Sequence, residues 1–193
     1  FVSVSNVIKD VKNNGDKALL KYEKKYNQNN IIKPSFKQIS KSIGFIDRKV
    51  KKAIDLAYNR IYKFHSLQKF KNISYTDNFK NKIEYKYIPI ESVAIYVPGS
   101  TASYPSSVLM SAIPAIVAGV KRIVMINPGF KGKQNPAVLY AAKKLGIKEI
   151  LSMGGAQAIA SLAFIQKVNK VVGPGNKYVA EAKRQLSGKI LGT

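Results

Sequence analysis

The sequence predicts an α/β protein: a doubly wound, Rossmann-like parallel sheet preceded by an N-terminal helical segment. From Val93 onward, four short apolar strands alternate with helical segments, and each strand ends at a glycine-containing turn. Before that point, apolar residues recur every three or four positions, which is typical of amphipathic helices. We therefore expect a helical segment over residues 1–72 and a Rossmann-like domain over residues 73–193.

The N-terminal segment is expected to contain two helical stretches. The first carries an apolar face with a possible break at residues 13–16, where the sequence reads Asn-Asn-Gly-Asp. Its apolar residues are Val7, Ile8, Val11, Ala18, Leu19 and Tyr22. The second runs from about Ser40 to Leu67 with one apolar stripe. His65 lies near its end, a position more typical of a surface residue than of a metal ligand.

The part after residue 72 begins with a pattern typical of strands. Residues 83–90 alternate apolar and polar side chains, and two such strands in residues 73–92 could form a hairpin. The strands expected next lie at residues 93–97, 122–126, 149–153 and 170–172, and the helices at residues 105–119, 135–145, 156–164 and 176–186. These strands are nearly all apolar, which indicates a parallel sheet covered on both faces. Pro114 lies inside the first of these helices and could kink or split it.

Composition excludes several kinds of site. The chain has no Cys and a single His, so disulfides are excluded and a zinc site built from this chain alone is improbable. We therefore predict no metal ligand here. We also predict no catalytic residue, because His65 is remote in sequence from Ser106 and Ser107, which lack a nucleophile-elbow signature. No apolar run approaches the roughly 18 residues that span a bilayer. The absence of Cys is compatible with a reducing cytoplasm, where we expect the protein to reside.

The net charge of +23 invites a nucleic-acid interpretation, which the residue types disfavour. Only four of the 33 basic residues are Arg, the side chain preferred for reading bases and gripping phosphates. The Lys residues are scattered over nearly every helix. We expect no specific nucleic-acid partner. The first residue is not Met and the chain ends without an obvious stop, so we expect both ends to be cuts.

Ligands of open α/β sheets bind beyond the carboxyl ends of the strands. The expected loops at that edge are residues 98–103, 127–129, 154–157 and 173–176. Their glycines and the helix N-termini that follow suit an anion such as a dinucleotide pyrophosphate, although the G-x-G-x-x-G fingerprint and the Walker loop are absent. The polar candidates are Tyr96, Gln157 and Asn176. Each also has a structural interpretation: a core aromatic with a bonded hydroxyl, a solvated helix start and a helix N-cap.

At these loops the sequence resembles histidinol dehydrogenase. The matching segments are VAIYVPG at residues 93–99, PSSVLM at 105–110, GGAQAIA at 154–160, VGPGN at 172–176 and AKRQ at 182–185, with a softer match at residues 15–19. The order and approximate spacing agree over residues 83–188. The stretch between Gln157 and Asn176 is shorter than is usual in the family, and Ser100 stands where the family often has Gly.

The resemblance implies an enzyme that oxidises L-histidinol through L-histidinaldehyde to L-histidine and reduces two NAD. It implies a homodimer with one zinc per active site. The family's NAD contacts include a Tyr, a Gln and an Asn that match Tyr96, Gln157 and Asn176. Its zinc ligands and its Glu-His acid/base pair have no counterpart before Thr193. We therefore expect an N-terminal fragment that holds part of the cofactor surface and is inactive alone.

Two other functions remain open at this stage. The chain could be a stand-alone module that binds a nucleotide or phosphate without catalysis, in which case NAD titration would detect a site within this chain. It could also bind nucleic acid, and the mark of that function would be sequence-dependent affinity at physiological salt.

Overall fold

The computed structural model describes residues 2–99, 104–129 and 133–192. Residues 100–103 of the first predicted loop lie outside these ranges. The helices are α1 (Val2–Asn27), α2 (Phe36–Ile43), α3 (Arg48–Ser66), α4 (Pro105–Ala118), α5 (Pro136–Lys144), α6 (Gly155–Phe164) and α7 (Lys177–Gln185). The strands are β1 (Ile73–Thr76), β2 (Lys82–Tyr85), β3 (Ser92–Tyr96), β4 (Arg122–Ile126), β5 (Glu149–Leu151), β6 (Lys170–Val172) and β7 (Leu191–Gly192).

Five parallel strands form the central sheet in the order β5-β4-β3-β6-β7. The chain builds outward from β3 to β5 and then returns across β3 to place β6 on its other side. The point where the order reverses therefore lies between the carboxyl ends of β3 and β6. This arrangement confirms the predicted doubly wound α/β fold. The short edge strand β7 was not predicted.

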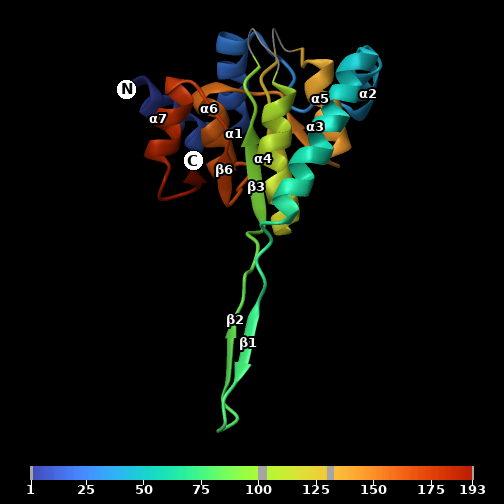
Figure 1. The fold of residues 1–193 in the computed structure, drawn as a ribbon. Coiled ribbons are helices and arrows are strands. Elements are labelled where there is room, and N and C mark those ends of the chain that lie inside the picture. The colour runs from blue at the N-terminus through green and yellow to red at the C-terminus, as the bar shows by residue number, and fades with distance from the viewer. Residues whose placement is uncertain (1, 100–103, 130–132, 193) are drawn as a thin grey trace.

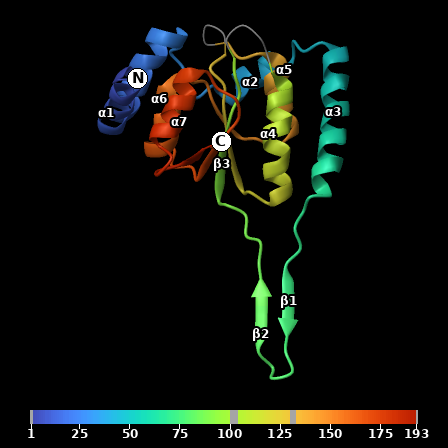
Figure 2. The same ribbon diagram turned by 60° about the vertical axis from the view of Figure 1, so that its left-hand side comes forward.

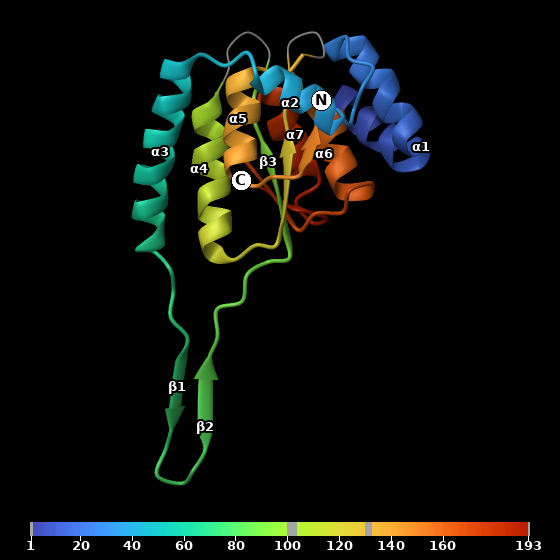
Figure 3. The ribbon, with the colours of Figure 1, turned by 90° about the vertical axis from the view of Figure 1, so that its right-hand side faces the viewer.

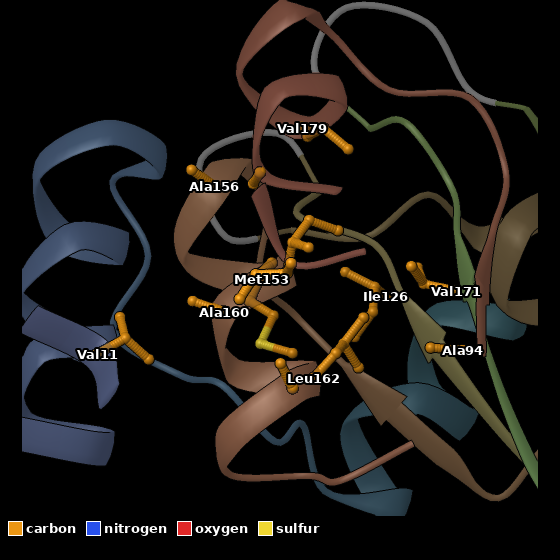
Figure 4. Close-up of a cluster of buried hydrophobic side chains, with 14 of the residues drawn as sticks. Val11, Ala94, Ile126, Met153, Ala156, Ala160, Leu162, Val171 and Val179 are labelled. Atoms are coloured by element: carbon orange, nitrogen blue, oxygen red, sulfur yellow. The ribbon is translucent and has the colours of Figure 1, made fainter. Parts of the chain in front are cut away.

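Helices cover both faces of the sheet, as the nearly all-apolar strands require (Figure 2). On one face α6 and α7 pack on the sheet, and α1 packs on both of them. Their buried side chains form one core with Val11, Ala94, Ile126, Met153 and Leu162 among its members (Figure 4). On the other face α4 and α5 pack against α2 and α3 around a second core.

Helix α1 is bent at Gly15, within the predicted break. Gly15 has φ 53° and ψ −132°, a backbone conformation that residues with a Cβ atom rarely adopt. The Asp10 carboxylate accepts hydrogen bonds from Asn14 Nδ2, Lys21 Nζ and Tyr22 Oη, and so joins the two halves across the bend. These bonds lower the pKa of Asp10 to about 2. Apolar residues from both halves, such as Val11 before the bend and Leu19 after it, belong to the core that α6 shares.

The second predicted helical stretch is divided in the structure, so one continuous helix from Ser40 to Leu67 was wrong. α2 ends at Ile43 and α3 begins at Arg48, because the Asp47 carboxylate caps the new helix by accepting from the N–H groups of Lys49 and Val50. α4, in contrast, continues through Pro114 to Ala118 without splitting.

The predicted division of the chain into two domains at residue 72 stays a prediction. The helices α2 and α3 pack on the sheet domain through α4 and α5, and α1 shares a core with the sheet.

Strands β1 and β2 form the expected antiparallel hairpin. It extends from the body of the molecule as a two-stranded arm, with neither strand packed on a helix (Figures 1 and 3). Cross-strand neighbours share a face: Ile73 lies opposite Tyr85, and Tyr75 opposite Ile83. All four of these side chains are exposed. The arm is therefore amphipathic, with an apolar face in solvent.

We expect the Gly15→Ala variant to lose roughly 1–3 kcal/mol of unfolding free energy, the usual cost of forcing a side chain into such a backbone conformation. A Cβ at Gly15 would meet no atom within 4 Å, so any loss measures conformational strain rather than a clash. Urea unfolding followed by circular dichroism measures the difference.

Gly188→Ala is the matched control, because a Cβ there also meets no atom within 4 Å and its φ lies outside the left-handed range. A stability change of the same size in both variants would contradict the strain at Gly15.

Candidate functional site

The candidate site is a pocket of about 540 Å³ at the carboxyl edge of the sheet. It lies where the strand order reverses, the position at which open α/β sheets bind ligands. The three residues proposed from the sequence all line it, although they come from β3, α6 and the turn before α7. The other lining residues are Ser3, Val4, Val7, Tyr26, Asn27, Pro98, Gly99, Pro128, Gly155, Ala156, Gly175 and Tyr178.

Tyr96 joins the end of β3 to the start of α6. Its side chain is buried, and its hydroxyl oxygen accepts a hydrogen bond from the N–H of Gly155 at 3.1 Å. Burial raises the pKa of the Tyr96 hydroxyl, so the group stays neutral at physiological pH. Tyr96 is therefore a core aromatic residue with a bonded hydroxyl, and it also lines the pocket.

Gln157 is only 2% exposed. The interpretation of Gln157 as a solvated residue at the start of a helix was therefore wrong. Its Nε2 donates to Glu23 Oε1 at 2.9 Å, and Glu23 is a residue of α1. The backbone at Gly155, two residues earlier, has φ +68°, and a Cβ there would stand 2.8 Å from the Gln157 side-chain oxygen. A glycine at this position therefore leaves room for the amide.

Glu23 is the main residue that the sequence analysis missed. It is fully buried and has three hydrogen-bond donors: the N–H of Gly154 at 2.9 Å, Gln157 Nε2 at 2.9 Å and Asn27 Nδ2 at 2.7 Å. Burial raises the pKa of the Glu23 carboxyl, and the three hydrogen bonds oppose that shift. A signal existed in the sequence, because Glu23 lies four residues after Leu19 on the apolar face of the helix.

Asn176 caps α7 and also lines the pocket. Its Oδ1 accepts hydrogen bonds from the N–H groups of Tyr178 and Val179, both at 3.1 Å. The cap satisfies two backbone donors in the first turn of α7, and leaves the Asn176 Nδ2 group for other contacts. Tyr178, on the first turn of α7, is 46% exposed and adds an aromatic wall that the sequence analysis did not single out.

Among residues 2–99, 104–129 and 133–192, no group of three or more His, Asp or Glu side chains is arranged to hold a metal ion. His65 stands at the end of α3 with its Nδ1 2.6 Å from Gln68 Oε1. Glu149 pairs with Arg122, and Glu181 with Arg184. The described residues do not fit a zinc site. The described helices include none with the length and apolarity to cross a bilayer.

The family model of histidinol dehydrogenase matches residues 2–191. The chain belongs to the histidinol dehydrogenase family. Relatives of the same name include that of Pelagibacter ubique, 72% identical over 98% of this chain, and that of Agrobacterium fabrum, 46% identical over 97%. The chain spans 45% of the length of each of these two proteins.

The fold agrees with a crystal structure of histidinol dehydrogenase from Elizabethkingia anophelis. The TM-score is 0.92 at 37% sequence identity, over 98% of this chain and 46% of that one. Because the family match extends over residues 2–191, it includes the helices of the N-terminal segment as well as the sheet. The alternative of a stand-alone nucleotide-binding module is therefore not favoured.

The raised pKa of Glu23 predicts a specific pH dependence of stability. The folded protein binds this proton more readily than the unfolded chain does, so the contribution of Glu23 is fully present below the unfolded pKa of about 4.3 and is lost as pH rises through the folded pKa. The unfolding free energy of the wild type relative to Glu23→Gln should therefore increase as pH falls from about 7 to 5, by at most about 1.4 kcal/mol per pH unit.

Urea unfolding of both proteins across this range measures the difference, in which the titrations of the other carboxyl groups cancel. Parallel stability profiles of the two proteins would show that the pKa of Glu23 is not raised.

Proposed function

We propose that the protein is an NAD-dependent dehydrogenase that oxidises L-histidinol through L-histidinaldehyde to L-histidine, and that the pocket beside Tyr96, Gln157 and Asn176 binds part of the NAD. The convergence of these three side chains on one pocket at the topological switch point carries the proposal. Membership of the histidinol dehydrogenase family supports the substrate and the reaction class.

The described residues fit a nucleotide better than they fit a metal. The pocket combines apolar walls from Val4, Val7 and Ala156 with amide groups of Gln157 and Asn176, the mixture typical of small-molecule sites. NAD supplies the hydride acceptor when it is bound, and the chain binds and orients it. We propose that zinc and the groups that move protons belong to parts of the protein beyond these residues. We also propose a cytoplasmic location.

We expect Gln157→Ala and Asn176→Ala each to weaken NAD binding at least about tenfold, because each removes a polar contact at the pocket and Asn176→Ala also removes the cap of α7. Isothermal titration of NAD into the protein, expressed from its full coding sequence, measures the affinity. L-histidinol should give NADH, followed by its absorbance, and both variants should lower the rate at subsaturating NAD.

Gln68→Ala is the control, since Gln68 is an exposed amide at the far end of α3. The proposed cofactor site would be wrong if the folded wild type gave no binding signal with NAD, or if the control lost as much affinity as the pocket variants.

We also propose a homodimer in which the apolar face of the hairpin packs against a second copy of the protein. An isolated two-stranded hairpin is marginally stable in water, and this one exposes Ile73, Tyr75, Ile83 and Tyr85 on a single face. Burial of that face against a partner would stabilise the arm. The other face carries Ser74, Thr76, Lys82 and Glu84 and is suited to solvent.

Ile83→Lys should therefore shift the protein from dimer toward monomer, because it places a charge in the apolar contact. Ser74→Lys, on the opposite face of the same hairpin, should leave the dimer intact. Sedimentation velocity at micromolar concentration distinguishes the two species. A dimer unaffected by Ile83→Lys, or a wild type that is monomeric throughout, would contradict this interface.

A further inference from the structure

The N-terminus of α6 is already occupied by two side chains of the protein. The N–H of Gly154 donates to the Glu23 carboxylate, and the N–H of Gly155 donates to the Tyr96 hydroxyl. In dinucleotide-binding folds, such free N–H groups commonly hold a phosphate. Here the Glu23 carboxylate supplies the negative charge that the helix dipole favours. A phosphate placed at this helix would have to displace Glu23 or lie against its charge.

The same carboxylate fixes which way the Gln157 amide points. An ionised carboxylate only accepts hydrogen bonds, so the amide must turn its NH2 group toward Glu23. The Gln157 oxygen then accepts no hydrogen bond from any described residue, while Gln157 lines the pocket. It is not among the buried side-chain atoms without a partner, so this oxygen retains contact with the open space. It is an acceptor at the pocket wall for which no described residue supplies a donor.

The orientation of Gln157 offers a reason for the burial of the Glu23 carboxylate. Its described contacts include three hydrogen-bond donors but no cation, although the chain carries a net charge of +23. Burying a carboxylate without a cation is costly even when it is hydrogen-bonded. An amide at the same position would accept from Gly154 without that cost. What a glutamine could not do is accept at both oxygen positions, because one Glu23 oxygen accepts from Gly154 and Gln157 and the other accepts from Asn27 Nδ2. A glutamine would turn its own NH2 group toward one of these donors, so it could not hold the whole set, the Gln157 amide included, in a single arrangement.

We propose that Glu23 is a positioning residue that locks the Gln157 amide with its oxygen toward the pocket, so that an uncharged hydrogen-bond donor of the nucleoside, an amino or hydroxyl group, binds at α6 and the pyrophosphate lies elsewhere. The inference rests on the proposed binding of NAD and identifies which part of the dinucleotide contacts this helix. It departs from the sequence-based expectation that the helix N-termini at this edge receive the phosphate.

The test compares Glu23→Gln, Gln157→Glu and the exchanged double variant E23Q/Q157E with the wild type, in the protein expressed from its full coding sequence. Isothermal titration with NAD and with adenosine gives the affinities, and thermal unfolding gives the stability. Glu149→Gln is the control for loss of one carboxylate, because Glu149 begins β5 at the opposite edge of the sheet from the pocket.

Glu23→Gln should weaken NAD and adenosine alike by about five- to tenfold, the usual worth of one hydrogen bond, while the unfolding temperature stays equal or rises. Gln157→Glu sets two carboxylates against each other and should bind more weakly still. The exchanged pair restores one amide donor and one carboxylate acceptor, and should recover affinity to within about threefold of the wild type. The Glu149→Gln control should bind as the wild type does.

Several results would overturn the proposal. They are unchanged affinity in Glu23→Gln, no recovery in the exchanged pair, a loss confined to NAD with adenosine unaffected, or a Glu23→Gln protein that does not fold, since the carboxylate would then serve stability alone. A folded wild type that binds neither NAD nor adenosine would overturn the proposed cofactor site itself, and this inference with it.

Discussion

The site depends on one buried contact between segments that are distant in sequence. Glu23 of α1 accepts from the backbone of Gly154 and from the side chain of Gln157, and so joins the N-terminal helix to the start of α6. The helix α1 belongs to none of the strand–helix repeats, yet it supplies Val4, Val7 and Tyr26 to the pocket wall. The bend at Gly15 lets both halves of α1 contribute to the core that α6 shares. The pocket is therefore built jointly by the helical segment and the sheet.

The sequence predicted the sheet well because its signals are local. Strands such as Arg122–Ile126 and Lys170–Val172 are short apolar runs bounded by turns, and the structure gives them the predicted bounds. The glycine-ended strands also predicted the edge where Tyr96, Gln157 and Asn176 meet, since parallel strands bring their carboxyl ends to one side. The break between α2 and α3 was missed because the apolar stripe continues through it, and only the Asp47 cap reveals the new start.

The identity of the partners at the site could not be read from the sequence in the same way. Whether Gln157 is solvated or buried depends on α1. This helix packs on α6 although the two are more than a hundred residues apart in the sequence. A glutamate on an amphipathic helix usually lies on the solvated face, so Glu23 gave only a weak signal by its register with Leu19. Side-chain contacts that cross between segments need the tertiary arrangement, whereas strands and caps are decided within a few residues.

The hairpin and the pocket lie on different parts of the molecule, and different physical demands apply to them. The backbone donors at the starts of α6 and α7 are bonded within this chain, to Glu23, Tyr96 and Asn176. In the hairpin, the two strands hydrogen-bond to each other through their backbones but leave the side chains of Tyr75 and Ile83 in water. A core of two strands cannot bury a face of that size by itself. The proposed cofactor contacts can therefore be preorganised within this chain, whereas the apolar face of the hairpin stays in solvent unless a surface from outside the hairpin covers it.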